Sequence, residues 1–493
     1  MIPAIRRVVG SYCARSRIRI WAPIHTQVVE VRCGAPDGDV RSAFKNGWTR
    51  MMVITATPSR PRIRHSSSSR RARLIRQKGK CPNKNEMRIS TAACSPCSVH
   101  GRIATLRATM GLGDLSIYLD NLAMTPIDPR VVALHAETAL ALRANPNSGE
   151  HASGQQAQTL LLESAASVGS FIGHETDDTM FTPSASSALW IAVQDAINRG
   201  GSRRIRVVAT AIEHPSLLRH LVEADRQERI TLTLLPVSRL GQPDPDALRR
   251  LCKERIDLIC VMAANNEIGT ICPVGDFLDI AQEHGARTLV DASQAAGRIA
   301  MRNDLARADY VVINGSKMYG PRGLGVLSGA VSRRTRDGLH YLFGTVDAAA
   351  AVAMAAACAL RATEMGADEA RIAKQRDTLQ GLLIERVPGL VVNGDEGSRL
   401  AGVLHVSAPA VSGEALVARL WGKVDLSTGA ACQSGVDGPS HVLRAMKVAD
   451  WISDGAVRMC VGKFNDDAEI AEAGALVAST MNTIAASSVR RYA

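Results

Sequence analysis

Two stretches, Thr288-Leu-Val-Asp-Ala-Ser-Gln294 and Tyr310-Val-Val-Ile-Asn-Gly-Ser-Lys317, decide the fold of this chain. Each begins with a short run of apolar residues, which is typical of a parallel strand that is buried on both faces. Each then ends in polar residues, with Asp291 in the first stretch and Lys317 in the second. Because α/β folds bind ligands at the carboxyl ends of parallel strands, we expect both side chains to face one site.

A Lys amine and a carboxylate placed in this way suit pyridoxal phosphate. This cofactor needs an amine for a Schiff base and an acid beside its ring nitrogen. The alternative is a surface Lys in a Gly/Pro turn and an unrelated Asp at a strand end. The residues that surround the pair favour the cofactor.

Helix-like and strand-like segments alternate from about residue 125 to 345, which predicts a mostly parallel, doubly wound sheet. The pattern then becomes helical and mixed. The chain is therefore interpreted as an α/β protein with a large domain and a smaller α+β domain. The expected ranges are 1–109 for a leader, 110–345 for the large domain and 346–493 for the small domain with a Cys loop. As an alternative, about the first 15 residues of the large-domain range belong to the small domain.

Positive charge is concentrated at the N-terminus of the 493-residue chain. Residues 1–109 contain 22 Lys and Arg against 4 Asp and Glu, whereas the remainder contains 37 against 43. The overall pI therefore gives no reason to expect a nucleic-acid partner. We interpret 1–109 as disordered or absent from the mature protein, with Met110 as the working start. A mitochondrial transit peptide is the alternative, although 109 residues is long for one.

The sequence gives little sign of a metal site, a disulfide or a membrane span. Cys94-Ser-Pro-Cys97, with Cys81 and His100 nearby, is a weak zinc pattern, because a second well-spaced pair is missing. The six later cysteines show no disulfide spacing, so we expect a reducing compartment. The most apolar stretch, 348–360, is too short to span a bilayer and predicts a buried helix.

Further motifs place polar groups near the same sheet edge. Thr182-Pro-Ser-Ala-Ser186 opens a helix and can bind a phosphate, although an ordinary N-cap has the same pattern. Glu213-His214 and Asn265-Asn266 each follow a predicted strand. A lone His there is more often structural than functional.

Two residues near the C-terminus add to this set. Cys432 lies in a loop of small residues, where a thiol can be exposed and reactive, although most cysteines are buried apolar residues. Arg458 lies in an apolar strand and needs an anionic partner, which a substrate carboxylate would supply.

With these motifs in order, the chain resembles the cysteine desulfurases of the NifS/IscS type, in the class V aminotransferase family of fold-type I pyridoxal phosphate enzymes. The resemblance runs from about Ile117 to Ile470. It is carried by eight short motifs that are weak singly and specific together: Leu119-Asp-Asn-Leu-Ala-Met-Thr-Pro126, Asn145-Pro-Asn-Ser148, Glu213-His214, Asn265-Asn-Glu-Ile-Gly269, Asp291-Ala-Ser-Gln294, Lys317-Met-Tyr-Gly-Pro-Arg-Gly323, Gly429-Ala-Ala-Cys432 and Val457-Arg458.

The resemblance implies a role for each matching residue. Lys317 would form the Schiff base and shuttle the α-proton, and Cys432 would take the sulfur. His214 would stack on the ring and serve as acid or base. The other cofactor-binding residues implied are Asp291 at the ring nitrogen, Gln294 and Asn266 at the ring oxygen, Ala185, Ser186, Asn314 and Ser316 at the phosphate, and Thr345 at the phosphate of a neighbouring subunit. Arg458 and Asn145 would bind the substrate.

The sequence departs from the family pattern in three places. Pro183-Ser-Ala-Ser186-Ser187 replaces the usual phosphate motif, and Ser316 replaces a His before Lys317. The segment before Gly344-Thr345 is shorter than in the family, which makes Thr345 the least secure site residue.

The resemblance implies a homodimeric cysteine desulfurase that forms L-alanine from L-cysteine and leaves a persulfide on Cys432. The sulfur would go to an acceptor or iron–sulfur scaffold protein, for cluster assembly or thiolation. No metal site is expected beyond Cys432 as a transient iron–sulfur ligand, and neither nucleic acid nor membrane is expected as a partner. The expected location is the cytoplasm, with the mitochondrial matrix as the alternative.

Other functions stay open at this point. The altered phosphate motif and the shortened segment also suit a selenocysteine lyase, another β-lyase or an aminotransferase, in which Cys432 would be incidental. A catalytically weakened desulfurase-like binding protein is a further alternative.

Overall fold

A computed structural model describes residues 19–20, 29–30, 116–174, 178–336, 338, 344–428 and 440–492; of residues 19–20, 29–30 and 489–492 it describes the backbone alone. The chain divides into two compact units, Met1–Cys94 and Ser95–Ala493. In the first unit, β1 (Arg19–Ile20) and β2 (Val29–Glu30) form an antiparallel pair. The interpretation of 1–109 as a leader lies almost wholly outside the described residues.

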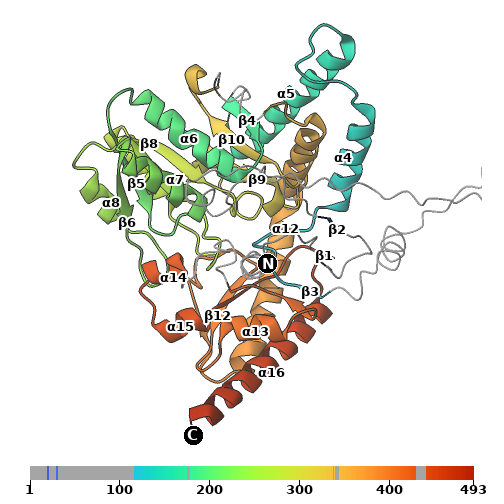
Figure 1. Ribbon diagram of the computed structural model, residues 1–493, viewed down its shortest axis with the longest axis vertical. Coiled ribbons are helices and arrows are strands. Elements are labelled where there is room, and N and C mark those ends of the chain that lie inside the picture. Colours follow the sequence, from blue (N-terminus) through green and yellow to red (C-terminus); the bar gives the residue numbers. More distant parts are fainter. Residues whose placement is uncertain are drawn as a thin grey trace, which may run out of the picture. The chain divides into compact units, whose positions relative to one another are not determined.

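A seven-stranded sheet in the order β4-β10-β9-β8-β7-β5-β6 forms the centre of the second unit (Figure 1). Strands β5 to β9 are parallel, and β10 runs antiparallel to both of its neighbours. The strands are β4 (Thr179–Thr182), β5 (Ile205–Thr210), β6 (Ile230–Leu235), β7 (Leu258–Met262), β8 (Arg287–Asp291), β9 (Tyr310–Asn314) and β10 (Gly325–Gly329). This arrangement, with helices on both faces, confirms the predicted fold class.

Helices cover both faces of this sheet because its central strands are apolar on both sides. In β7, Leu258 and Cys260 belong to one core cluster, whereas Ile259 and Val261 belong to the other. Helices α6 (Ala185–Arg199) and α7 (Pro215–Arg226) supply the first cluster. The second cluster draws on α5 (Ala152–Ile172), α8 (Pro245–Leu251), α9 (Val274–His284), α10 (Arg302–Leu305) and α12 (Ala348–Arg386).

A second core lies around two small sheets. Strands β11 (Val391–Val392), β12 (Val403–Ser407) and β14 (Val457–Cys460) form an antiparallel sheet, and β3 (Ile117–Tyr118) pairs in parallel with β13 (Val424–Asp425). The remaining elements are α4 (Pro129–Ala141), η2 (Gly315–Lys317), α13 (Gly413–Arg419), α14 (His441–Ala445), α15 (Asp450–Asp454) and α16 (Asp467–Tyr492). Leu119 lies in this second core. The domain boundary predicted after residue 345 stays a prediction, because α12 runs continuously through both cores.

Helix α12 is much longer than the apolar stretch 348–360 that predicted it. Its first half contributes Met354 to the sheet core, and its second half contributes Leu379 to the second core. By length and composition it could cross a membrane, but half of its most apolar window is buried. The helix continues through Arg361 because the guanidinium is buried against Gly297 O at 2.8 Å and Asp368 at 2.5 Å. We therefore interpret α12 as a core helix.

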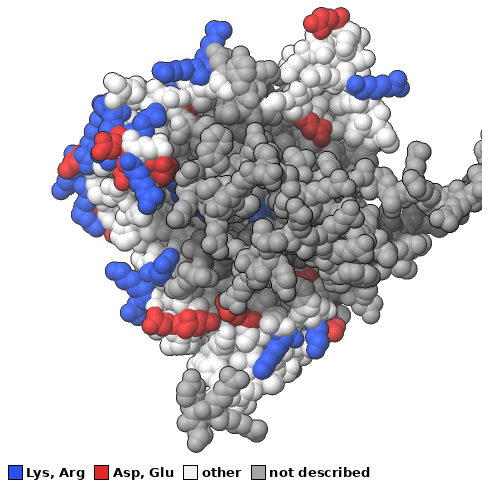
Figure 2. All heavy atoms as spheres, viewed as in Figure 1, with Lys and Arg blue, Asp and Glu red and all other residues white. Residues whose placement is uncertain are grey.

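Charged side chains of both signs are mixed on the face shown in Figure 2, most densely over the part of the molecule that contains α8, β5 and β6. Several of them are paired there, such as Arg203 with Asp257 at 2.7 Å and Arg204 with Asp225 at 3.2 Å. This mixture differs from the single-sign patch that nucleic-acid binding requires. The absence of a nucleic-acid partner stays a prediction.

Candidate active site

A cavity of about 120 Å³ lies at the carboxyl ends of the parallel strands. It brings together most of the predicted site residues, which come from the ends or following turns of β5, β7, β8 and β9, from the start of α6 and from β14. Those on its wall are Ala185, Ser186, His214, Asn266, Asp291, Gln294, Asn314, Lys317 and Arg458. Leu122, Ala123, Leu189, Ser216, Met262, Ala264 and Ser293 complete the lining.

Asp291 and Lys317 occupy the positions that the strand pattern predicts. Asp291 is the last residue of β8, and its Oδ1 accepts a hydrogen bond from Ser293 N at 3.0 Å. Lys317 ends the short helix η2 after β9, and its Nζ donates to Leu122 O at 3.3 Å and also to Ala123 O. An amine and a carboxylate therefore share one small, largely buried cavity.

Arg298 holds the backbone of Lys317 from behind the cavity. Its guanidinium is buried and donates to Lys317 O at 3.1 and 3.3 Å and to Asn121 O at 2.8 Å. Apart from Cys460 Sγ at 3.7 Å, its partners are main-chain carbonyls, which carry no sequence signal, so the sequence did not reveal this role. The sequence shows only that an Arg follows Gly297, which does not indicate a contact with Lys317.

The start of α6 forms a compact corner of the cavity, where the sequence predicts phosphate binding. Ser184 caps the helix by accepting from Ser187 N at 3.1 Å, and Ala185 and Ser186 form the first turn. Gly325 in β10 makes the close approach possible, because a Cβ atom there would lie 2.4 Å from Ser184 C and 2.5 Å from Ala185 N. The positive end of a helix with main-chain N–H groups in its first turn suits a phosphate.

Ser316 is buried beside Asn314 and is not part of the cavity wall. The Asn314 side chain accepts from Ser316 N at 3.1 Å and from Ser316 Oγ at 2.9 Å. Asn314 thus faces the cavity and also fixes the turn that carries Lys317. Contact between Ser316 and a phosphate stays a prediction.

His214 is the N-cap of α7, and its side chain is half-buried. Its Nδ1 accepts from Ser216 N at 3.2 Å and lies 2.7 Å from Ser216 Oγ. Because Nδ1 accepts a main-chain hydrogen bond, the neutral ring carries its proton on Nε2. Burial, which is the largest cause, lowers the pKa of His214, so the ring is neutral near pH 7.

Two buried carboxyl groups lie behind the cavity, and sequence reasoning gave neither a role. Glu213 Oε1 accepts from Thr210 Oγ1 at 2.6 Å and from Met262 N at 2.8 Å. Burial, followed by the charge of Asp291, raises the pKa of Glu213 to about 8. Glu267 accepts from Ser440 Oγ, and burial raises its pKa to about 7. Glu213 therefore joins the ends of β5 and β7 as a neutral acid.

Four residues on the cavity wall each carry a buried polar atom that has no hydrogen-bond partner among the described residues. The atoms are Asn266 Oδ1, Ser293 Oγ, Gln294 Oε1 and Arg458 Nε. Buried polar atoms are normally paired, so such a group marks a place where a polar ligand fits. Together with Asp291, Lys317 and the corner at α6, this donor and acceptor set fits pyridoxal phosphate and a substrate carboxylate.

Besides Ser316, two predicted residues that the structure describes, Asn145 and Thr345, are not on the cavity wall. Asn145 Nδ2 donates to Thr345 Oγ1 at 3.2 Å, and both residues are exposed, so they lie together outside the cavity wall. Their roles in binding substrate and a neighbouring subunit's cofactor stay predictions. Cys432 and most of the shortened segment before Gly344 lie outside the described residues.

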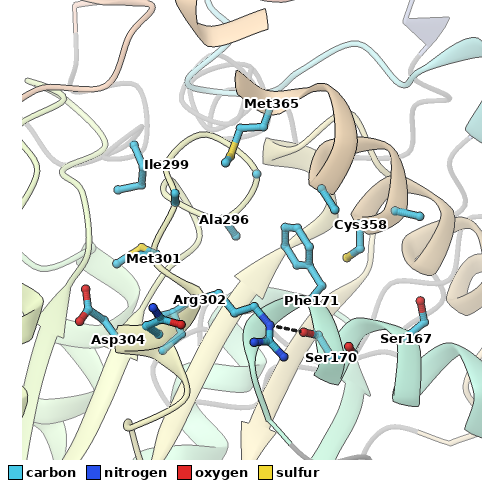
Figure 3. A pocket seen from close by; sticks show the side chains of 16 residues that line it. Ser167, Ser170, Phe171, Ala296, Ile299, Met301, Arg302, Asp304, Cys358 and Met365 are labelled. Atoms are coloured by element: carbon cyan, nitrogen blue, oxygen red, sulfur yellow. Dashed lines mark hydrogen bonds between the residues drawn. The ribbon is translucent and has the colours of Figure 1, made fainter. Parts of the chain in front are cut away.

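A larger cavity, of about 670 Å³, lies between α5, residues 296–305 and α12 (Figure 3). Its wall is mostly apolar, with Phe171, Met301 and Cys358, and Arg302 Nε donates to Ser170 O at 2.9 Å. None of the predicted site residues lines it. The described part of the chain also contains no group of three or more His, Cys, Asp or Glu able to hold a metal ion.

Comparisons with known proteins show which family the chain is similar to. The Aminotransferase class-V family model matches residues 117–340. A probable mitochondrial cysteine desulfurase from Dictyostelium discoideum is 32% identical over 368 residues, which cover 72% of this chain and 80% of the relative. A cysteine desulfurase IscS from Rickettsia bellii is 28% identical, and the match covers 92% of that relative. A solved NifS-like protein superposes with a TM-score of 0.68 at 25% identity, covering 75% of this chain and all of that one. The chain therefore belongs to the cysteine desulfurase family, whose members carry the class V aminotransferase domain and use pyridoxal phosphate.

Proposed function

We propose that this chain converts L-cysteine to L-alanine and transfers the sulfur to Cys432 as a persulfide. The single observation that carries the proposal is the cavity that joins Lys317, Asp291 and Arg458. An amine, a carboxylate and a buried guanidinium are the groups that a pyridoxal enzyme for an amino acid needs. The cysteine desulfurase relatives support this reaction over the selenocysteine lyase, other β-lyase, aminotransferase and binding-protein alternatives.

The roles of the cavity residues follow from their chemistry. When bound, pyridoxal phosphate supplies an electron sink for the bonds at Cα and Cβ of the amino acid. Asp291 would hold a positive charge at the ring nitrogen, and Gln294 and Asn266 would pair with polar groups of the ring. Lys317 would carry the proton that leaves Cα, since its Nζ reaches into the cavity. His214, neutral and with a proton on Nε2, would stack on the ring and donate a hydrogen bond.

The substrate carboxylate would bind Arg458. This guanidinium is buried in β14, and its Nε has no partner among the described residues. A carboxylate satisfies such a group with short, charge-assisted hydrogen bonds. The substrate thiol would then point away from Arg458.

In the sulfur-transfer step, the Cys432 thiolate attacks the sulfur of the substrate. A sulfur–sulfur bond forms as the substrate carbon–sulfur bond breaks, and the bonding electron pair stays with Cβ. Cβ takes up a proton and becomes the methyl group of L-alanine. Cys432 retains the sulfur as a persulfide, so atoms and electrons balance without an external oxidant.

The persulfide would pass to an acceptor or iron–sulfur scaffold protein, with Cys432 as a transient cluster ligand during assembly. We propose a homodimer in which Thr345 reaches the cofactor of the other subunit. The cytoplasm is the proposed location, in keeping with the bacterial relatives. The mitochondrial relative supports the mitochondrial matrix as the alternative.

The test is Cys432→Ala in the cofactor-loaded protein. We expect the variant to lose sulfide release from L-cysteine in the presence of a thiol reductant, while the visible absorbance of the cofactor stays unchanged. Cys252→Ala serves as the control, because Cys252 lies at the end of α8, away from the cavity. Unchanged sulfide release in Cys432→Ala, or a wild type that makes no alanine from cysteine, would contradict the proposal.

A further inference from the structure

Arg458 is held at two points that together decide where its guanidinium lies. The side chain is 1% exposed. Its Nη2 donates to Asp120 Oδ1 at 2.7 Å, and its Nη1 donates to Asn266 O at 2.7 Å. A buried guanidinium is costly unless it is paired, so these acceptors fix its position. The remaining nitrogen, Nε, has no partner among the described residues.

Asp120 is itself fixed from two sides. Its main chain forms a bridge with Cys460 at the end of β14, and Cys460 N donates to Leu119 O at 2.6 Å. Its Oδ1 also accepts from Ser427 Oγ at 3.4 Å. Ser427 in turn pairs with the main chain of Arg458 through hydrogen bonds of 2.6 and 3.2 Å. The carboxylate therefore has a defined position relative to β14.

Asp120 is not on the cavity wall, whereas Arg458 is. Arg has a long side chain with many rotamers, and two acceptors at its two terminal nitrogens fix the plane of its guanidinium. We propose that Asp120 is a positioning residue, which holds Nη2 of Arg458 so that the guanidinium meets the carboxylate of L-cysteine. This inference rests on the proposed function, because it assigns the substrate carboxylate to Arg458.

A role through charge and a role through position make opposite predictions for Asp120. The negative charge of Asp120 repels a second carboxylate at Arg458, so a role through charge alone means that its loss strengthens substrate binding. A role through position means that the oxygen matters and its charge matters little. Asp120→Asn keeps an acceptor oxygen at the same distance from the backbone. Asp120→Glu keeps the charge but adds one methylene, which displaces the guanidinium.

The experiment compares these two variants as full-length, cofactor-loaded protein. KM and kcat for L-cysteine are measured by alanine formation, and the dissociation constant of L-alanine is measured by calorimetry. For Asp120→Glu we expect KM and the dissociation constant to rise about tenfold or more, with a smaller change in kcat. For Asp120→Asn we expect both values within about threefold of the wild type.

Asp425→Glu is the matched control. Asp425 lies in the neighbouring strand β13 and accepts from Ser116 Oγ at 2.5 Å, without touching Arg458. The same one-methylene change there is expected to leave both constants unchanged. The proposal is overturned if Asp120→Glu binds L-alanine like the wild type, or if Asp120→Asn is impaired as strongly as Asp120→Glu.

A second variant covers the case in which Asp120→Glu does not fold. Ser427→Ala removes one hydrogen bond that holds Asp120 and is expected to raise the dissociation constant of L-alanine about two- to threefold. An unchanged constant would overturn the proposal. The proposed function and the positioning role of Asp120 fail in different ways. A wild type that forms no alanine from L-cysteine would rule out the proposed function. An active wild type with an unimpaired Asp120→Glu removes only the positioning role.

Discussion

At the scale of single residues, Glu213 shows how burial sets the charge behind the cavity. Its folded-state pKa of about 8 lies above the ordinary 4.5. The folded protein therefore holds a proton that the unfolded chain releases, and this carboxyl group lowers stability as the pH rises from about 5 to 8. Above about pH 8 the folded protein has also released this proton, so Glu213 causes no further loss of stability.

We predict that Glu213→Gln removes this loss. The amide keeps the acceptor for Thr210 and Met262 and cannot ionise. Relative to the wild type, the variant should gain about 1 kcal/mol or more in free energy of unfolding between pH 5 and pH 9. Urea unfolding of both proteins at pH 5, 7 and 9 measures the difference. A difference that does not change with pH would show that Glu213 is ionised in the folded protein.

The sequence predicted the residues that follow strands and missed those that act through the main chain. Asp291 and Lys317 could be placed because a run of apolar residues precedes each one, and parallel strands end at a common edge. Arg298 and the carbonyls of Leu122 and Ala123 could not be found in this way. Carbonyl oxygens are present at every residue, so nothing in the sequence distinguishes the ones that hold Lys317.

At the scale of elements, the contact between β10 and α6 shapes the corner at the start of α6, where a phosphate is predicted to bind. Gly325 lets the strand approach the main chain of Ser184 and Ala185, and no side chain fits in the gap. We predict that Gly325→Ala displaces the start of α6 and weakens cofactor retention, at a cost of about 1–3 kcal/mol. Loss of visible absorbance on dialysis measures the effect.

Gly366→Ala in α12 is the control for that prediction. A Cβ atom at Gly366 meets nothing within 4 Å, and Ala favours a helix more than Gly does. This variant should retain cofactor like the wild type. If Gly325→Ala retains cofactor equally well, the start of α6 is not the phosphate site.

Element ends were harder to predict than element types. A helix such as α9 (Val274–His284), whose apolar pattern stands between clear breaks, is predictable with its bounds. Helix α12 is not, since its middle contains Arg361, whose buried partners come from Gly297 and from a later turn of α12 itself. A charged residue ends an apolar run in the sequence, but it does not end a helix when the fold supplies its counter-ions.

At the scale of the whole molecule, every residue that lines the cavity belongs to the second unit. We predict that a chain starting at Met110 keeps the cofactor absorbance and a kcat for alanine formation within about twofold of the full chain. Absorbance spectra before and after L-cysteine, with alanine quantified, measure both. A colourless shortened chain that cannot be reloaded with pyridoxal phosphate would assign residues 1–109 a part in the fold.

The hydrogen bonds of residues 119–125 also determine when the enzyme becomes competent during synthesis. All seven strands of the large sheet have left the ribosome once Gly329 has emerged, so that sheet can form early. The segment around Asp120, made long before, must wait for β13 and for Arg458, which are translated well after Gly329. A nascent chain can therefore contain the folded large sheet and still be unable to bind its amino-acid substrate.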